Sequence, residues 1–262
     1  MKIQNSIKIQ NSEFKTLAIV QARMSSTRLP AKVLREINGK PMLWYLVECL
    51  KNSKQIDKIV IATSDHADDY AIEEFCREND IDCFRGDLND VLKRFSDCAR
   101  KYSEYKTIVR VTGDCPLIDP EVVDKLIEVF ETEGDVDYVS NVLKETYPDG
   151  IDAEVFSQES LLESDREAEL GSEREHVTLY IRNNPKYKKV NVENEENLSR
   201  FRLTVDNPED FEVIDFLITN YGYKAGFKDY CDRLSENPEV MAKNAKIVRN
   251  EGLLKSLKED KK

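Results

Sequence analysis

The chain has 262 residues, of which 40% are hydrophobic and 34% are charged, so it is long enough to bury one sizeable core. Its 39 Lys and Arg residues against 51 Asp and Glu residues give a formal net charge of −12. A surface this acidic disfavours unspecific binding to nucleic acid or to an anionic membrane, and we expect neither partner. No apolar run approaches the ~20 residues that span a bilayer. The six cysteines contain no CxxC pair, so we expect a cytoplasmic protein with reduced thiols.

Patterns of strand and helix alternate through the first half of the chain. Residues 1–15, in which KIQNS occurs twice, predict a flexible leader. The predicted strands that follow are 16–21, 56–63, 83–85 and 107–112, and the predicted helices are 41–50, 67–79, 91–95 and 120–130. Four such alternations are typical of a parallel sheet with helices on both faces. We therefore expect one α/β domain over residues 16–262, with a mixed, mostly parallel central sheet.

The pattern changes after residue 134. Further strands are predicted at 136–142, 152–156, 188–192 and 201–205, and further helices near 172–183 and 208–221. Residues 237–262 predict a charged C-terminal helix. No Pro-, Gly- or Ser-rich linker separates the two halves, which favours a single domain with an elaborated second half.

Several motifs that would point to other chemistry are absent. The chain has no GxxxxGK[ST], GxGxxG, HExxH or GxSxG, and its two histidines exclude a histidine-rich metal site. Two DxD triplets, at 80–82 and 135–137, match the metal motif of glycosyltransferases. Each lies where a predicted helix gives way to a strand, and such triplets are common in an acidic chain, so they are weak evidence.

The first candidate site is the loop QARMSSTRLPAKVL at residues 21–34, which follows a predicted buried strand. In parallel sheets the ligand crevice lies beyond the carboxyl ends of the strands. Arg23, Arg28 and Lys32 supply three cations there, with hydroxyl groups and free backbone N–H groups between them. This combination suits a triphosphate. A solvated basic turn explains the composition equally well.

This loop resembles the N-terminal signature of the nucleotide-sugar cytidylyltransferases, especially the SpsF-like spore-coat polysaccharide branch, whose pattern is roughly QARxGSTRLPxKVL. Ser25 departs from that pattern, in which the position is Gly; if the glycine lets the loop close over phosphate, a side chain there would hinder nucleotide binding. The resemblance continues in order through ATSD (62–65), FRGDLNDVLKRF (84–95), RVTGDCPLIDP (110–120), YPDGIDAEVF (147–156), EREHVTLYI (173–181) and TVDNPEDFEVI (204–214). It implies a single Rossmann-like nucleotide-diphospho-sugar transferase domain.

A second candidate site pairs Asp114 with Asp206. Each aspartate ends a predicted strand, in TGDCP and in TVDNP. Two carboxylates fixed at strand ends suit Mg²⁺ bound to phosphate oxygens. Aspartates before prolines also cap turns and helices, so the residues alone leave metal binding open. The family resemblance implies that Asp114 and Asp206 hold Mg²⁺.

The resemblance also implies a reaction and its residues. CMP would pass from CTP to a sugar or sugar-acid acceptor, with release of pyrophosphate. The expected catalytic residues are Arg23, Lys32, Asp114 and Asp206. The expected nucleotide-binding residues are Ala22, Arg23, Ser26, Arg28, Lys32, Ala62, Thr63, Ser64, Asp65, Arg85, Asp90 and Arg94.

The acceptor is expected to bind near YPDGIDAEVF and EREHVT. Asp152 and Glu154 are two residues apart on a predicted strand and would therefore share a face. The expected acceptor-binding residues are Tyr147, Asp152, Glu154, Glu175 and His176. Asp152 or His176 would then also deprotonate the acceptor hydroxyl. Alternatively, Glu175 favours a helix N-terminus and His176 is a satisfied, half-buried residue.

Residues 136–156 are the candidate dimerisation and acceptor insertion, because the resemblance implies a homodimer built through a strand-rich insertion. Two other functions stay open at this point. One is a glycosyltransferase that uses a nucleotide sugar on the same fold. The other is a non-catalytic CTP-binding protein, which the serine at position 25 makes conceivable.

Overall fold

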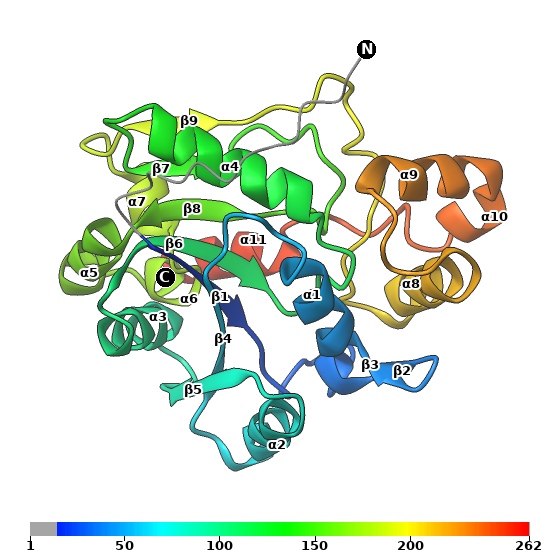
Figure 1. The fold of residues 1–262 in the computed structure, drawn as a ribbon, viewed down its shortest axis with the longest axis horizontal. Helices are drawn as coiled ribbons and strands as arrows, with labels where there is room; N and C mark the ends of the chain where they lie inside the picture. The colour runs from blue at the N-terminus through cyan, green and yellow to red at the C-terminus, as the bar shows by residue number, and fades with distance from the viewer. Residues whose placement is uncertain (1–14, 262) are drawn as a thin grey trace.

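A seven-stranded sheet in the order β5-β4-β1-β6-β8-β7-β9 forms the centre of the computed structural model, which describes residues 15–261 (Figure 1). Its strands are β1 (Lys15–Gln21), β4 (Lys58–Ser64), β5 (Asp82–Gly86), β6 (Tyr105–Thr112), β7 (Tyr138–Ser140), β8 (Glu154–Ser157) and β9 (Lys189–Asn191). Strands β5, β4, β1 and β6 are parallel to one another, whereas β8 runs antiparallel to β6 and β7. The predicted mixed, mostly parallel sheet is confirmed.

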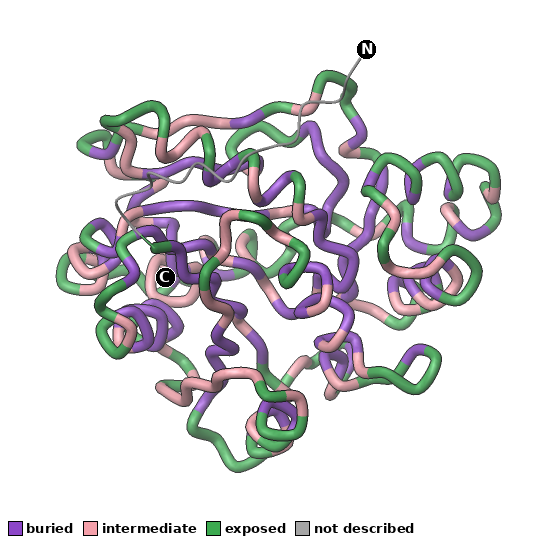
Figure 2. The backbone as a smooth tube through the Cα atoms, viewed as in Figure 1, coloured by how far each residue is buried: buried purple, intermediate pink, exposed green. Residues whose placement is uncertain are grey.

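Helices cover both faces of this sheet, and its inner strands are buried along most of their length, whereas the edge strands β5 and β9 are half-buried (Figure 2). In β1, Ala18 and Val20 join the core with α1, α2 and α4, whereas Leu17 and Ile19 join the core with α3, α5 and α7. This alternation explains why the strand is apolar at every central position. The helices are α1 (Met42–Leu50), α2 (Tyr70–Glu78), α3 (Val91–Lys101), α4 (Pro120–Thr132), α5 (Gln158–Glu167), α6 (Gly171–Glu175), α7 (Leu179–Asn183), α8 (Pro208–Tyr221), α9 (Phe227–Glu236), α10 (Pro238–Met241) and α11 (Glu251–Glu259).

Helix α8 begins where the sequence predicts, and its start fixes one of the candidate site residues. Pro208 occupies the first helical position, and Asn207 and Asp210 form a capping box. The carboxylate of Asp210 accepts hydrogen bonds from the backbone N–H groups of both Asp206 and Asn207, at 3.0 Å each. The cap therefore holds the backbone of Asp206 in place.

Three predicted elements of the chain need correction. Residues 201–205 do not form a strand: only one bridge, between Asp149 and Arg202, pairs this segment. The predicted helix 172–183 is divided into α6 and α7 because Val177 lies between them with a φ of 57°. The predicted helix 237–262 is also divided, since turns separate α10 from α11 and Asn250 has a φ of 60°. A non-glycine residue in this left-handed region does not continue a right-handed helix.

A short hairpin also precedes α1, which the sequence does not predict. Its strands are β2 (Glu36–Ile37) and β3 (Lys40–Pro41), with Asn38 and Gly39 both at positive φ in the turn. Pro41 consequently ends the hairpin and precedes the first helical residue instead of occupying that position.

The ends of the chain and the predicted insertion complete the fold. Residues 1–14 of the predicted leader lie outside the described residues, and Lys15 already belongs to β1. Within residues 136–156, the strands β7 and β8 are paired inside the central sheet, and the role of this segment in dimerisation stays a prediction. All six cysteines are free. Between residues 15 and 261, no helix combines the length and the apolar character needed to cross a membrane.

Candidate active site

A cavity of about 750 Å³ opens at the carboxyl ends of β1 and β6, where Gln21 and Thr112 end these strands. This is the position predicted for a ligand in a parallel sheet. Eight predicted site residues line it, namely Ala22, Arg23, Ser26, Arg28, Lys32, Asp114, Glu175 and Asp206. The opposite wall is α11, which contributes Glu251, Lys255, Ser256, Lys258 and Glu259.

Two glycines bring the two predicted metal-binding aspartates together. A side chain at Gly113 would place its Cβ only 2.9 Å from the carbonyl oxygen of Gln21. At Gly150, which has a φ of 103°, a Cβ would lie 2.5 Å from the backbone of Leu203 and Thr204. Only glycine permits approaches this close. As a result, the segment that carries Asp206 packs beside Asp114, and the N–H group of Val205 donates to the carbonyl oxygen of Asp114 at 2.9 Å.

The ammonium group of Lys32 lies between the two aspartates. Its Nζ atom is 2.8 Å from Asp114 Oδ2 and 2.8 Å from Asp206 Oδ1. Arg28 contacts the same oxygen of Asp206, at 2.9 Å. Lys32, Asp114 and Asp206, which are separated by more than 80 positions in the sequence, thus share one charged centre.

The charges of this centre shift one another's pKa values. Burial alone raises the pKa of Asp114, but the charge and hydrogen bond of Lys32 outweigh burial and lower this pKa to about 2. Burial likewise lowers the pKa of Lys32, whereas Asp114 and Asp206 raise it above its ordinary value. Both residues are therefore charged at neutral pH.

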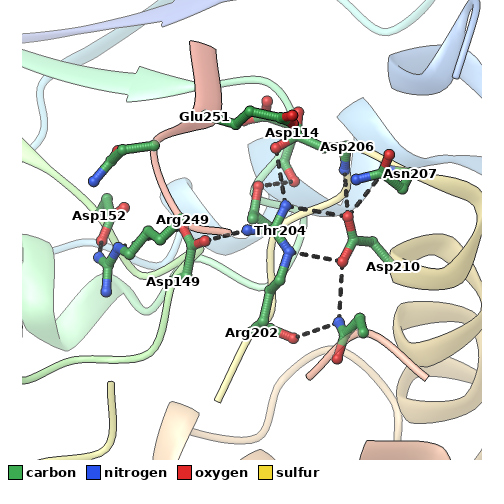
Figure 3. A network of polar contacts seen from close by, with 12 residues as sticks. Asp114, Asp149, Asp152, Arg202, Thr204, Asp206, Asn207, Asp210, Arg249 and Glu251 are labelled. Carbon is green, nitrogen blue, oxygen red and sulfur yellow. Dashed lines mark hydrogen bonds and ion pairs between the residues drawn. The ribbon is translucent and has the colours of Figure 1, made fainter. Parts of the chain in front are cut away.

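Arg202 holds the second oxygen of Asp206. Its guanidinium group contacts Asp206 Oδ2 at 2.9 Å, both oxygens of Asp210 at 2.7 and 3.1 Å, and the carboxylate of Asp149 (Figure 3). Burial lowers the pKa of Arg202, but its carboxylate partners raise it above the ordinary value. The centre therefore rests on a buried cation that stays charged at neutral pH.

Asp69 anchors the candidate phosphate loop, a role that the sequence does not reveal. Its Oδ1 atom accepts a hydrogen bond from the backbone N–H of Met24 at 2.7 Å. Its Oδ2 atom accepts from the N–H of Ser64 at 3.2 Å and from the hydroxyl of Ser64. The side chain is fully enclosed, so the loop after β1 is tied to the end of β4 by a buried carboxylate.

Other predicted nucleotide-binding residues do not line the cavity. Ala62, Thr63 and Ser64 are buried within β4. Arg85 points away, since it pairs with Glu73, donates to the carbonyl oxygens of Ser64 and His66, and stacks on the Tyr70 ring at 3.8 Å. Asp65, which directly follows β4, donates its backbone N–H to the carbonyl oxygen of Gly86 and also lies outside this lining.

Asp90 and Arg94 also have protein partners. Asp90 caps α3 and binds Arg174 through both carboxylate oxygens, at 3.0 and 2.6 Å. Arg94 is fully buried and donates to the carbonyl oxygen of Asp87 at 2.8 Å. Burial lowers the pKa of Arg94 to about 10. The neighbours of Asp90, Asn89 and Val91, line a second cavity of about 270 Å³. Arg23, Glu175, Ser256 and Glu259 line both cavities, so the two adjoin.

Two of the predicted acceptor-binding residues are enclosed by protein and do not fit that role. Tyr147 is buried against Phe227, with ring centroids 5.3 Å apart. Glu154 is buried between Arg110, Tyr138 and Thr178. The predicted strand 152–156 begins only at Glu154, so Asp152 precedes β8 and is not part of the strand.

The remaining three acceptor candidates all contact the C-terminal segment. Asp152 accepts a hydrogen bond from Arg249 at 2.6 Å (Figure 3). Burial is the main cause that raises the pKa of Asp152 to about 7, against the opposing charge of Arg249. Ser256 contacts Glu175 at 2.6 Å and His176 Nε2 at 3.1 Å. Burial lowers the pKa of His176, so the ring is neutral at pH 7.

Ser25 meets no conformational obstacle. It is exposed, and it is not among the residues with positive φ. The backbone conformation at this position is therefore open to any residue, and glycine is not required for the loop to fold as it does.

Comparisons with known proteins find similarity over most of the chain. The sequence model of a family described as "Cytidylyltransferase" matches residues 17–257. The spore coat polysaccharide biosynthesis protein SpsF of Bacillus subtilis is 37% identical over 235 residues, which are 86% of this chain and 95% of that protein. A cytidylyltransferase structure from Leptospira borgpetersenii has a TM-score of 0.83 at 33% identity and covers 87% of this chain and 97% of its own. A CMP:2-keto-3-deoxy-manno-octonic acid synthetase complexed with CTP has a TM-score of 0.60 at 17% identity, covers 78% of this chain and 98% of its own, and shares the fold.

Proposed function

The chain belongs to the cytidylyltransferase family, and from this premise we propose that it transfers CMP from CTP to a sugar or sugar-acid acceptor with release of pyrophosphate. The acceptor oxygen forms a bond to the α-phosphorus of CTP, and the bond between that phosphorus and the bridging oxygen to the β-phosphate breaks. Such a reaction depends mainly on positioning and on neutralising phosphate charge.

The observation that carries this proposal is the charged centre of Lys32, Asp114 and Asp206 at the carboxyl ends of β1 and β6. Arg23, Arg28 and Lys32 line one cavity together with the hydroxyl-bearing residues Ser26 and Thr27 of the same loop. Three cations that converge on one space favour a triphosphate, because each further phosphate oxygen brings negative charge that needs a partner. The adjoining cavity beside Asn89 then accommodates the base.

We also propose that Mg²⁺ binds to Asp114 and Asp206. The donor set fits, because two carboxylates from distant segments already point at a single cationic atom, Lys32 Nζ. Mg²⁺ prefers one or two carboxylates together with phosphate oxygens. When bound, it would neutralise the charge that develops on the phosphates. Lys32, with its pKa raised by the same aspartates, then remains charged and is free to contact phosphate.

The acceptor is proposed to bind on the side of Asp152, Glu175 and His176. Two of these residues, Asp152 and His176, titrate near or below neutral pH, which suits the removal of a proton from an acceptor hydroxyl. SpsF is named for spore coat polysaccharide biosynthesis, and the synthetase that shares the fold is named for a sugar acid. A sugar or sugar acid is the class of acceptor that these names support. A homodimer and a cytoplasmic location remain predictions from the sequence.

The direct test is pyrophosphate release with Mg²⁺ and each of four nucleoside triphosphates, against a panel of sugars, sugar acids and phosphorylated acceptors. We expect release with CTP that depends on one acceptor. Release from a nucleotide sugar, with CTP left untouched, would instead indicate a glycosyltransferase. CTP binding without release of pyrophosphate from CTP, whichever acceptor of the panel is present, would count against catalysis.

A further inference from the structure

Two lysines of the cavity wall have no ionic partner among the residues that the structure describes. Lys255 and Lys258 lie three residues apart on α11 and line the same cavity as Arg28 and Lys32. Arg28 and Lys32 are both ion-paired. The side-chain ammonium group of neither Lys255 nor Lys258 has an ion pair or a hydrogen bond to any residue between 15 and 261. The positive charges of Lys255 and Lys258 are therefore available to an anion that enters the cavity, although Glu259 of the same helix also lines it. Arg28 and Lys32, by contrast, are already neutralised by carboxylates.

Glu251, at the start of the same helix, takes part in that neutralisation. Its carboxylate binds the guanidinium group of Arg28, and it lies in the same group of charged residues as Asp114 and Asp206 (Figure 3). Arg28 is thereby shared between Glu251 and Asp206, the latter at 2.9 Å. Phosphate and carboxylate oxygens compete for the same guanidinium donors. A phosphate that binds Arg28 through Nη1 therefore replaces Glu251, whose carboxylate contacts that atom.

The attachment of α11 to the rest of the molecule is mostly polar. Ser256 is its one buried residue, and it is held by Glu175 and His176. Beyond the last turn, Asp260 accepts a hydrogen bond from the backbone N–H of Ser172 at 3.1 Å. Leu254, which also lines the cavity, is 48% exposed. A helix with so little apolar burial can adjust to a ligand at a low cost.

We propose that α11 is a binding element of the cavity, in which Lys255 and Lys258 hold a polyphosphate chain and Glu251 is the counter-ion that this chain displaces from Arg28. The ligand is of the nucleoside triphosphate class, recognised from two opposite walls. This inference rests on the proposed function only for the nucleoside part, because the lysines and Arg28 recognise the polyphosphate itself.

The first test is a double substitution, Lys255→Gln with Lys258→Gln, in the full chain. Affinity for CTP and for inorganic tripolyphosphate is measured by titration calorimetry with Mg²⁺ present. We expect both affinities to fall by about tenfold, since each exposed charge contact contributes modestly. The salt dependence of binding should also become shallower, because fewer charges are neutralised. Lys246→Gln is the matched control: Lys246 is exposed, precedes α11 and does not line the cavity, so both affinities should stay unchanged.

The second test is Glu251→Gln, which removes the competing charge and keeps the side-chain size. We expect affinity for both probes to rise by about threefold to tenfold. Glu239→Gln, an exposed residue of α10 outside the cavity, should leave both affinities unchanged. Thermal unfolding of each variant identifies any loss of folding, which would lower affinity for a different reason.

The outcomes separate this inference from the proposed function. If the wild type binds tripolyphosphate but not CTP, the cytidylyl assignment fails, and the variants still decide the role of α11. If the wild type binds CTP and the lysine and Glu251 variants match it in affinity and salt dependence, the inference is overturned while the proposed function stands. If the wild type binds neither probe, both are overturned.

Discussion

The two walls of the cavity are built in different ways. The wall after β1 follows a strand whose residues Leu17–Val20 are fully buried, and Asp69 ties its backbone to β4. The wall formed by α11 buries one residue and is held by polar contacts. Its neighbour Val248 is 61% exposed. The difference indicates that the segment after β1 is a fixed wall, which positions the charged centre. Helix α11 is an adjustable wall, which can shift when a ligand binds in the cavity.

Charge follows the same division at two of the three cations on the fixed wall. Lys32 and Arg28 are paired with carboxylates before any ligand arrives, whereas Arg23 has no ion pair to any residue between 15 and 261. The two lysines of α11, Lys255 and Lys258, have no ion pair to any residue that the structure describes. Paired cations keep their geometry, and unpaired ones raise the local attraction for an anion. The predictions below test this division from the largest expected effect to the smallest.

Asp114→Asn should remove most of the activity. The substitution takes one of two carboxylates from the proposed Mg²⁺ site and leaves Lys32 with Asp206 alone. We expect turnover to fall by about 100-fold or more, which is typical for loss of a group that stabilises developing charge. The rate is measured as pyrophosphate release, with thermal unfolding to show that the fold is intact. Asp97→Asn, on the outer face of α3, is the control, and a near-normal rate in Asp114→Asn would remove the metal assignment.

Asp69→Asn should loosen the fixed wall. The amide cannot accept at both oxygen positions, so the N–H of Met24 or the groups of Ser64 lose a buried partner. We expect the free energy of unfolding to fall by about 1–3 kcal/mol, the usual cost of an unsatisfied buried polar group. Chemical denaturation measures this, and CTP affinity should fall with it. An unchanged unfolding free energy would show that the loop is held by other contacts.

Asp152→Asn should flatten the pH dependence of stability. The folded pKa of Asp152, about 7, lies above its ordinary value of 3.8, so the folded state holds the proton more tightly than the unfolded state between these values. The stability that this proton contributes is fully present below pH ~4 and is lost as the pH rises through about 7. Between pH ~4 and about 7, the free energy of unfolding of the variant should therefore fall less than that of the wild type, and the difference should be on the order of 1–2 kcal/mol. Identical pH profiles of denaturation for the two proteins would contradict the raised pKa.

Ser25→Gly should have the smallest effect. Ser25 is exposed and has no strained backbone, so replacing it removes neither a buried contact nor a conformational constraint. We expect nucleotide affinity to be equal or slightly improved, as measured by titration with CTP. A marked loss of affinity would show that the Ser25 hydroxyl takes part in binding.

The sequence predicts the fixed wall far better than the adjustable one. The strands at 16–21 and 107–112 are short apolar runs, and the carboxyl ends of such strands locate a ligand site without further information. The segment 201–205 has the same apolar character but only a single bridge in the structure, because its backbone packs against Gly150 instead of a partner strand. Sequence patterns do not reveal which partner a strand-like segment finds.

Side-chain partners are equally hidden. Arg85 and Asp90 have the right chemistry to bind a nucleotide. In the structure, however, Arg85 forms an ion pair with Glu73, and Asp90 forms one with Arg174. The contact between Arg28 and Glu251 joins residues 223 positions apart, so nothing in the local sequence signals it. In the sequence, α11 is indicated by a charged, amphipathic tail. Because such tails are usually solvated, this pattern does not predict that the helix lines a cavity.

The central claim is that the acceptor attacks the α-phosphorus of CTP. An experiment with CTP that is labelled at a single phosphate tests this claim most directly. With an acceptor identified from the panel, the reaction is run once with CTP labelled at the α-phosphate and once with CTP labelled at the γ-phosphate. We predict that the α-label passes to the acceptor product and that the γ-label leaves in pyrophosphate. Transfer of the γ-label to the acceptor, or its release as orthophosphate, would contradict cytidylyl transfer.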